Sequence, residues 1–221
     1  MTAAALYVGL GWWLTVAIIT GACLRGLSRF GRLPASLRYL TLFAGFEAVI
    51  ELTSKALIRI FQLKSNLFLI PLDAIGTVGL LALAYGQALR SAVFGRVMPW
   101  VLGIFGAYAL FDTLTALGTV RYFPSVQVAS DLLMFALAGL YFQKLLHELQ
   151  VVHLRREPFF WMSVGTVIYT LGDLQLALFG NYILLHVPAP QQLVTFSFVR
   201  VFLLLVFYGG CCRALWMRPQ K

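Results

Sequence analysis

The chain of 221 residues is 61% hydrophobic and only 11% charged, with a mean hydropathy of +0.86 and a formal net charge of +9. A composition this apolar excludes an ordinary soluble domain and is typical of membrane spans. The positive charge does not indicate a nucleic-acid partner, because the basic residues lie in short segments between apolar runs, where they determine orientation in the membrane.

Seven apolar segments can be read along the chain, each long enough to cross a hydrocarbon core about 30 Å thick. They cover residues 6–24, 36–60, 67–89, 97–117, 125–146, 158–185 and 192–215. We therefore predict an all-α fold, a polytopic integral membrane protein whose single domain, residues 1–221, is a seven-transmembrane-helix bundle.

The basic residues between these segments and near their ends are distributed unequally between the two sides of the predicted membrane. One side receives Arg25, Arg29, Arg32, Arg38, Arg90, Arg96, Lys144, Arg155, Arg156, Arg213, Arg218 and Lys221, and the other receives Arg59, Lys64 and Arg121. Since the side richer in Lys and Arg is cytoplasmic, we predict the N-terminus outside and the C-terminus in the cytoplasm.

Six of the eight acidic residues lie inside the predicted spans. They are Glu47, Glu51, Asp73, Asp112, Asp131 and Asp173, and two basic residues, Lys55 and Arg200, join them there. A charge near the bilayer centre costs about 2.5–3.5 kcal/mol, so such residues are rare and usually functional. Their spacing from the helix ends places most of them in the outer half of the bundle. This depth indicates either a polar cavity open to the outside or a buried network that ties the helices together.

The segment 36–60 carries three of these charges on one helical stripe, because Glu47, Glu51 and Lys55 are four residues apart. We expect an ion pair between Glu51 and Lys55. We expect Arg200 to bridge two carboxylates, since its planar fork donates to two acceptors. The carboxylates still outnumber the cations, so either some of the acids are protonated or a cation binds among them.

Polar residues also join membrane helices without any ligand, at about 0.6 kcal/mol each. Six acids on five helices favour a ligand or ion site over this purely structural role. The predicted binding residues are Glu47, Glu51, Asp73, Asp112, Asp131 and Asp173, with Lys55 and Arg200 balancing charge. The five tryptophans lie mostly near helix ends, and an interfacial belt explains most of them, so we do not interpret them as a ligand cage.

Several chemistries lack their residues in this sequence. His147, His153 and His186 all fall at membrane edges or in connections, so an intramembrane zinc site cannot be built from them. Arg200 stands on the last helix, where a retinal-binding protein needs a lysine. No phosphate-binding loop, Gly-x-Ser-x-Gly or dinucleotide fingerprint is present. We expect no catalytic residues, no metal and no cofactor, and we expect that the protein is not an enzyme.

Two motifs carry a resemblance to a known group. The sixth segment opens with Glu157-Pro158-Phe159-Phe160-Trp161 and continues with Gly165, Tyr169 and Gly172, and the fifth ends in Tyr141-Phe142-Gln143-Lys144-Leu145-Leu146-His147-Glu148-Leu149. With the acidic second segment, the chain resembles uncharacterised stand-alone bacterial seven-transmembrane-helix proteins. Similar helical regions are sometimes encoded beside sensor kinases, so the resemblance implies a sensory role and a place in the bacterial inner membrane.

These observations leave three functions open. We expect a receptor- or sensor-like membrane protein that binds a small polar or cationic ligand, or protons, in an outward-facing acidic cavity and signals through a cytoplasmic partner. The first alternative is a proton- or cation-coupled transporter that uses the same acids. The second is a structural subunit of a larger membrane complex, in contact with another membrane protein or with a second copy of the chain.

Overall fold

The computed structural model describes residues 3–60, 69–116, 125–147, 157–186 and 189–217. These residues form seven α-helices and one short 3₁₀ helix. The helices are α1 (Ala3–Ser28), η1 (Phe30–Arg32), α2 (Ala35–Arg59), α3 (Leu69–Leu89), α4 (Ala92–Ala116), α5 (Ser125–His147), α6 (Pro158–His186) and α7 (Ala189–Trp216). The predicted all-α fold is confirmed. A helix suits a lipid environment because it satisfies nearly all of its own backbone hydrogen bonds.

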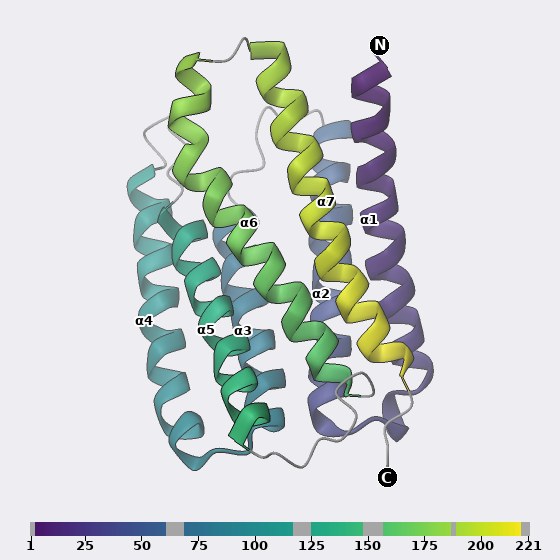
Figure 1. Ribbon diagram of the computed structural model, residues 1–221, viewed down its shortest axis with the longest axis vertical. Coiled ribbons are helices and arrows are strands. Elements are labelled where there is room, and N and C mark those ends of the chain that lie inside the picture. The colour runs from purple at the N-terminus through teal and green to yellow at the C-terminus, as the bar shows by residue number, and fades with distance from the viewer. Residues whose placement is uncertain (1–2, 61–68, 117–124, 148–156, 187–188, 218–221) are drawn as a thin grey trace.

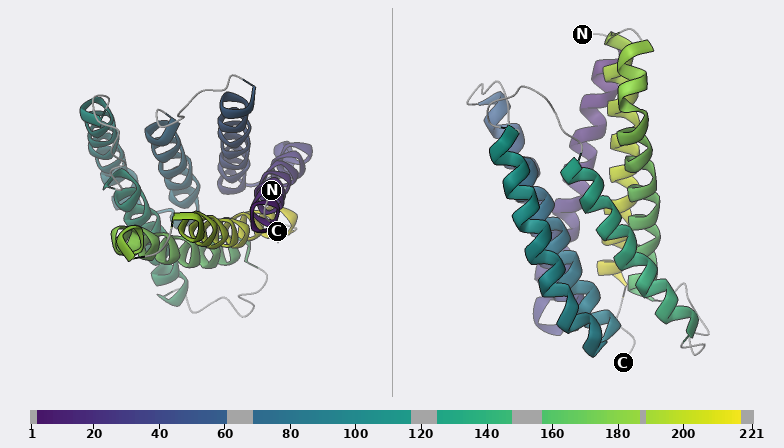
Figure 2. Two further views of the ribbon diagram at one scale, coloured as in Figure 1. Left: turned by 90° about the horizontal axis from the view of Figure 1, so that it is seen from above. Right: turned by 90° about the vertical axis from the view of Figure 1, so that its left-hand side faces the viewer.

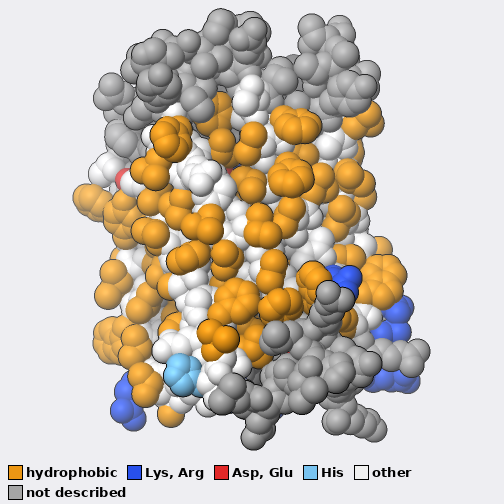
Figure 3. All heavy atoms as spheres, viewed as in Figure 1, with side chains coloured by type: hydrophobic (Ala, Val, Ile, Leu, Met, Phe, Trp, Pro, Cys, Tyr) orange, Lys and Arg blue, Asp and Glu red, His pale blue; other side chains and the backbone are white. Residues whose placement is uncertain are grey.

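Six of the helices, α1 and α3 to α7, are long and apolar enough to cross a membrane, so this is a multi-pass membrane protein. Figure 3 shows the hydrophobic side chains that cover the middle of one face of the molecule. The exception is α2, because Glu47, Glu51 and Lys55 make it too polar to stand out as a span. Its outward face is nevertheless apolar, with Leu42, Val49 and Leu52 exposed.

The helices form a ring of six with one helix outside it (Figures 1 and 2). Around the ring, α1 packs against α2, α2 against α3, α3 against α5, α5 against α6, α6 against α7, and α7 against α1. The remaining helix, α4, packs mainly on α3 and stands at one edge of the bundle (Figure 1). The two ends of the chain lie at opposite ends of the bundle.

In the half of the bundle away from the N-terminus, the inside of the ring is filled by side chains. Here the interior holds fully buried Phe43, Leu81, Tyr85, Met162 and Leu215. The Tyr85 hydroxyl is 3.0 Å from the Ser163 hydroxyl, so this buried polar group is satisfied. Lys and Arg side chains gather at this end of the molecule (Figure 3), where α1, α3, α5 and α7 end.

The observed helix bounds lie close to the predicted ones, with the largest difference at α4. This helix begins at Ala92 rather than at residue 97, so Pro99 lies inside it. The earlier start follows from Ser91, whose hydroxyl accepts a hydrogen bond from the Phe94 N–H at 3.4 Å and so caps the first turn. Arg90 precedes it with a φ of 51°, a left-handed conformation that turns the chain sharply from α3 into α4.

Candidate functional site

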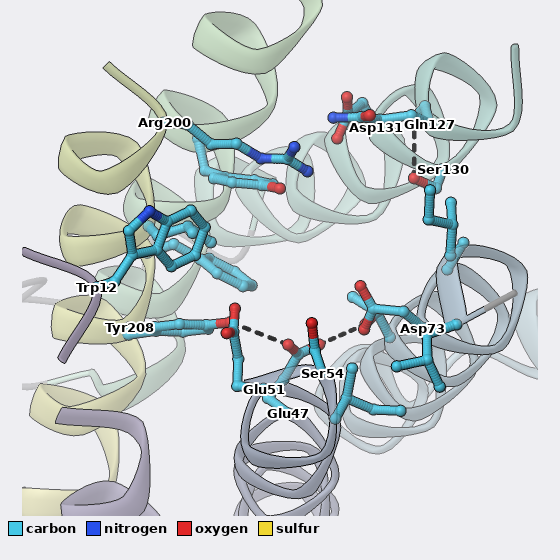
Figure 4. A pocket seen from close by; sticks show the side chains of 18 of the residues that line it. Trp12, Glu47, Glu51, Ser54, Asp73, Gln127, Ser130, Asp131, Arg200 and Tyr208 are labelled. Atoms are coloured by element: carbon cyan, nitrogen blue, oxygen red, sulfur yellow. Dashed lines mark hydrogen bonds between the residues drawn. The ribbon is translucent and has the colours of Figure 1, made fainter. Parts of the chain in front are cut away.

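A cavity of about 500 Å³ lies inside the ring, within the range of small-molecule sites. All six ring helices contribute to its wall (Figure 4): α1, α3 and α5 from their first halves, α2 from its second half, and α6 and α7 from their middles. Because successive helices run in opposite directions, these portions meet in the half of the bundle that holds the N-terminus. The charged residues on the wall are Glu47, Glu51, Lys55, Asp73, Asp131 and Arg200.

Glu47 forms the floor of the cavity on α2 and is buried. One of its carboxylate oxygens accepts a hydrogen bond from the Thr77 hydroxyl on α3, and the other accepts one from the Tyr208 hydroxyl on α7 at 2.9 Å. Both oxygens are therefore satisfied, and the carboxylate joins three helices at the point where the cavity meets the packed half.

One turn further along α2, Glu51 and Lys55 form the predicted ion pair, with the Lys55 Nζ 3.2 Å from the Glu51 Oε2. The same Nζ lies 4.8 Å from the centroid of the Trp12 ring on α1, a cation–π contact. The predicted stripe is thus confirmed, since Glu47, Glu51 and Lys55 all line the cavity.

Asp73 faces this stripe from α3 (Figure 4), and its Oδ1 lies 3.5 Å from the Thr77 hydroxyl, whose single proton is donated to Glu47. Arg200 comes from α7 and lies within Coulombic range of both Asp73 and Asp131. The predicted bridging of two carboxylates by the guanidinium stays a prediction.

Asp131 on α5 lines the cavity and is only 1% exposed. Its Oδ2 atom is buried, and its carboxyl group lies within hydrogen-bond range of the Asp173 carboxyl, so one shared proton can join the two acids. Its neighbour Asp173 on α6 is equally buried, but it lies behind the wall, where its carboxylate accepts a hydrogen bond from the Gln127 side-chain amide. Asp173 therefore supports the wall and does not itself face the cavity.

Asp112 is the acid that the structure does not bring to this site. It lies on α4, outside the ring, and its Oδ1 accepts a hydrogen bond from the Ser125 hydroxyl at 3.2 Å. Of the six carboxylates expected to converge, four line the cavity, Asp173 lies directly behind it, and Asp112 lies apart. The separation follows from the packing of α4 on the outer side of α3.

Residues that the sequence analysis did not single out complete the wall. Thr77 stands four residues after Asp73, and Ser130 directly precedes Asp131. Their closeness in sequence to these two acids is the feature from which a place on the cavity wall could have been predicted. Trp12 and Trp13 also line the cavity, as do Tyr169 and Phe207, whose rings stack with centroids 5.1 Å apart. Trp12 and Trp13 therefore contribute to the cavity, in addition to the interfacial belt that was predicted for most of the tryptophans.

The arrangement of these groups suits a positively charged small molecule more than a coordinated metal ion. Four carboxyl groups and two basic groups line the cavity, so acidic groups outnumber basic groups there. Yet no three His, Cys, Asp or Glu side chains in the described part of the chain are close enough together to hold a metal. The acids are spread over α2, α3 and α5, on different sides of a space the size of a small molecule.

Comparison with protein-family models, with curated proteins and with solved structures finds no match for this chain. The resemblance to bacterial seven-helix proteins stays a prediction, and the function must be argued from the site itself.

Proposed function

We propose that this protein is a receptor- or sensor-like membrane protein that binds a small polar or cationic ligand, or protons, in the intramembrane cavity. The observation that carries the proposal is the convergence of Glu47, Glu51, Asp73 and Asp131 with Lys55 and Arg200 on one cavity. Charged groups inside a membrane protein cost free energy and are usually functional. Their convergence on one cavity favours a binding role over separate structural contacts between helices.

The proposal includes seven spans, with α2 as the seventh. This helix has 25 residues, and it turns Glu47, Glu51 and Lys55 to the cavity and Leu42, Val49 and Leu52 outward, as a lipid-facing helix requires. The basic residues gather at the end where the C-terminus lies, which the positive-inside rule makes cytoplasmic. The cavity then faces the outside of a bacterial inner membrane.

A receptor fits the interior better than a transporter does. Transport requires access to the site from both sides, but the cytoplasmic half is filled by large buried side chains such as Phe43, Tyr85 and Met162. A structural subunit would turn its acids toward a partner, whereas Asp131 and Asp173 point inward and are each 1% exposed. Signalling would pass to a cytoplasmic protein through the basic end of the bundle.

Ligand-dependent thermal unfolding of the purified protein tests the proposal, because a ligand that binds the folded state raises the unfolding temperature. Small polar solutes and cations are screened on the parent, on Asp73→Asn and on Asp112→Asn, the matched acid outside the cavity. We expect a solute that stabilises the parent and Asp112→Asn and loses its effect on Asp73→Asn.

Proteoliposomes separate the alternatives. If the stabilising solute accumulates inside vesicles that contain the protein, the protein is a transporter. If no solute stabilises the parent and both variants lower its stability equally, the acids are structural and the proposal fails.

A further inference from the structure

We infer that a groove on the outside of the bundle, between α4 and α5, binds one acyl chain of an anionic phospholipid, whose headgroup lies at the basic end of the groove. This site is separate from the inner cavity and goes beyond the proposed function. It exists because α4 stands outside the ring, where it packs mainly on α3 and has much less contact with α5 (Figure 1). The space left there is a groove of about 580 Å³, lined by residues from 89–101 and 133–147.

The walls of this groove are apolar for most of its length. Val97 and Met98 line it from α4, and Leu137 and Leu140 line it from α5. Val97 and Leu140 are 51% and 45% exposed, so the groove opens to the surface that lipid covers. At a rise of about 1.5 Å per residue, residues 91–101 of α4 extend for about 15 Å. This length is about half of a hydrocarbon core ~30 Å thick, which is the depth that an acyl chain of one leaflet occupies.

Polar side chains line the groove at one end only. They are Ser91, which directly precedes α4, and Gln143, Lys144 and His147, in the last turns of α5. Because α4 and α5 run in opposite directions, these residues meet at the end of the bundle where Lys and Arg side chains gather (Figures 1 and 3). The Lys144 Nζ donates a hydrogen bond to the Ala88 carbonyl oxygen at 2.8 Å, and this bond holds a positive charge at the polar end of the groove.

The charge at this end of the groove favours an anion. Arg90 adds a second cation there, since it is exposed in the turn between Leu89 and Ser91, which both line the groove. No Asp or Glu in the described part of the chain lines it. Basic pockets between membrane helices bind anionic lipid headgroups. An apolar helix of another protein could fill the groove but would offer nothing to these charges, whereas a phospholipid supplies both a chain and a phosphate.

Saturable shifts of the unfolding temperature in detergent test the inference. Dioleoyl phosphatidylglycerol is compared with dioleoyl phosphatidylcholine, which has the same chains and no net charge. We expect phosphatidylglycerol to stabilise the parent protein, and phosphatidylcholine to bind at least about fivefold more weakly. Lys144→Gln removes the charge and keeps a donor for the Ala88 carbonyl, so we expect it to lose most of this preference.

A second pair of variants locates the lipid. Ala136 is an exposed residue on the wall of the groove, and Ala136→Phe places a ring where the chain would lie. We expect this variant to lose the saturable response to phosphatidylglycerol. Ala107→Phe is the matched control, because Ala107 is exposed on α4 and does not line the groove, and it should respond like the parent.

Equal apparent affinities of the two lipids for the parent would overturn the inference, and this comparison holds even if a variant fails to fold. So would an unchanged response of a folded Ala136→Phe, or the absence of stabilisation by either lipid. Size-exclusion chromatography in detergent checks for another occupant: if the parent is a dimer that Ala136→Phe dissociates, the groove is an interface between two copies and the inference fails. Neither Lys144 nor Ala136 lines the inner cavity, so these outcomes leave the test of the proposed function separate.

Discussion

At the residue scale, Glu47 is the acid that the fold holds most firmly. Its two carboxylate oxygens are bound by hydroxyl groups from two other helices, Thr77 on α3 and Tyr208 on α7. Tyr208 is itself buried, with 2% of its surface exposed. Hydrogen bonds to a charged buried group are among the stronger ones in proteins.

Tyr208→Phe should therefore destabilise the protein by about 1–3 kcal/mol, because it leaves one buried oxygen of Glu47 without a donor. The free energy of unfolding in detergent measures this change. Tyr108→Phe is the control, since Tyr108 is 39% exposed on the outer helix α4. Equal stabilities of the two variants would show that the Tyr208 hydroxyl is not a structural donor.

The sequence predicts this residue-scale picture in part. The cost of charge in a membrane was enough to find the acids, and helical spacing was enough to pair Glu51 with Lys55. Spacing along one helix says nothing of partners on another. The Tyr208 hydroxyl bond to Glu47 and the Gln127 bond to Asp173 therefore required the structure.

At the scale of elements, α6 and α7 share the most extensive helix contact, and small residues allow their close approach. A Cβ atom added at Gly210 would lie 2.8 Å from the Trp161 carbonyl oxygen, and one added at Gly165 would lie 3.2 Å from the Val206 carbonyl oxygen. Both neighbours are backbone atoms, which cannot turn aside as a side chain can. Small residues at helix contacts are a common device of membrane proteins, because they let backbones pack closely.

Gly210→Ala should force the two helices apart and cost about 1–3 kcal/mol, the usual penalty for an overpacked interior. The adjacent Gly209→Ala supplies the control, since an added Cβ there meets no described atom within 4 Å. Thermal unfolding of both variants checks the prediction. If Gly210→Ala is as stable as Gly209→Ala, the contact between α6 and α7 is looser than described.

The presence of each helix can be predicted from the length of its apolar segment, because a segment that crosses the lipid must be a long helix whatever its neighbours are. The order of helices around the ring does not follow, since it depends on which surfaces fit together. For this reason the sequence analysis grouped Asp112 with the other acids, although α4 packs outside the ring. The start of α4 was also missed, because the Ser91 cap lies in a polar connection before the apolar run.

At the scale of the whole molecule, the bundle is divided into two unlike halves. The half that holds the N-terminus encloses the acidic cavity, and the other is filled by side chains such as Phe43 and Leu81. The composition predicts a membrane protein and the loops predict its orientation, but only the assembled ring gives the cavity its walls. From this asymmetry we infer that the cavity is accessible from one side of the membrane only. This accessibility is the central claim of the proposed function.

Cysteine accessibility tests that claim most directly. In a variant whose Cys23, Cys211 and Cys212 are replaced by Ala, single cysteines are introduced as Ser54→Cys, on the cavity wall, and Ser163→Cys, fully buried in the packed half. Intact cells are treated with membrane-impermeant thiol reagents, one cationic and one anionic. We predict that Ser54→Cys reacts from outside, faster with the cationic reagent because the cavity is acidic, and that Ser163→Cys does not react. If Ser54→Cys stays unlabelled from outside, or reacts faster with the anionic reagent, the account of an outward-facing acidic cavity is contradicted.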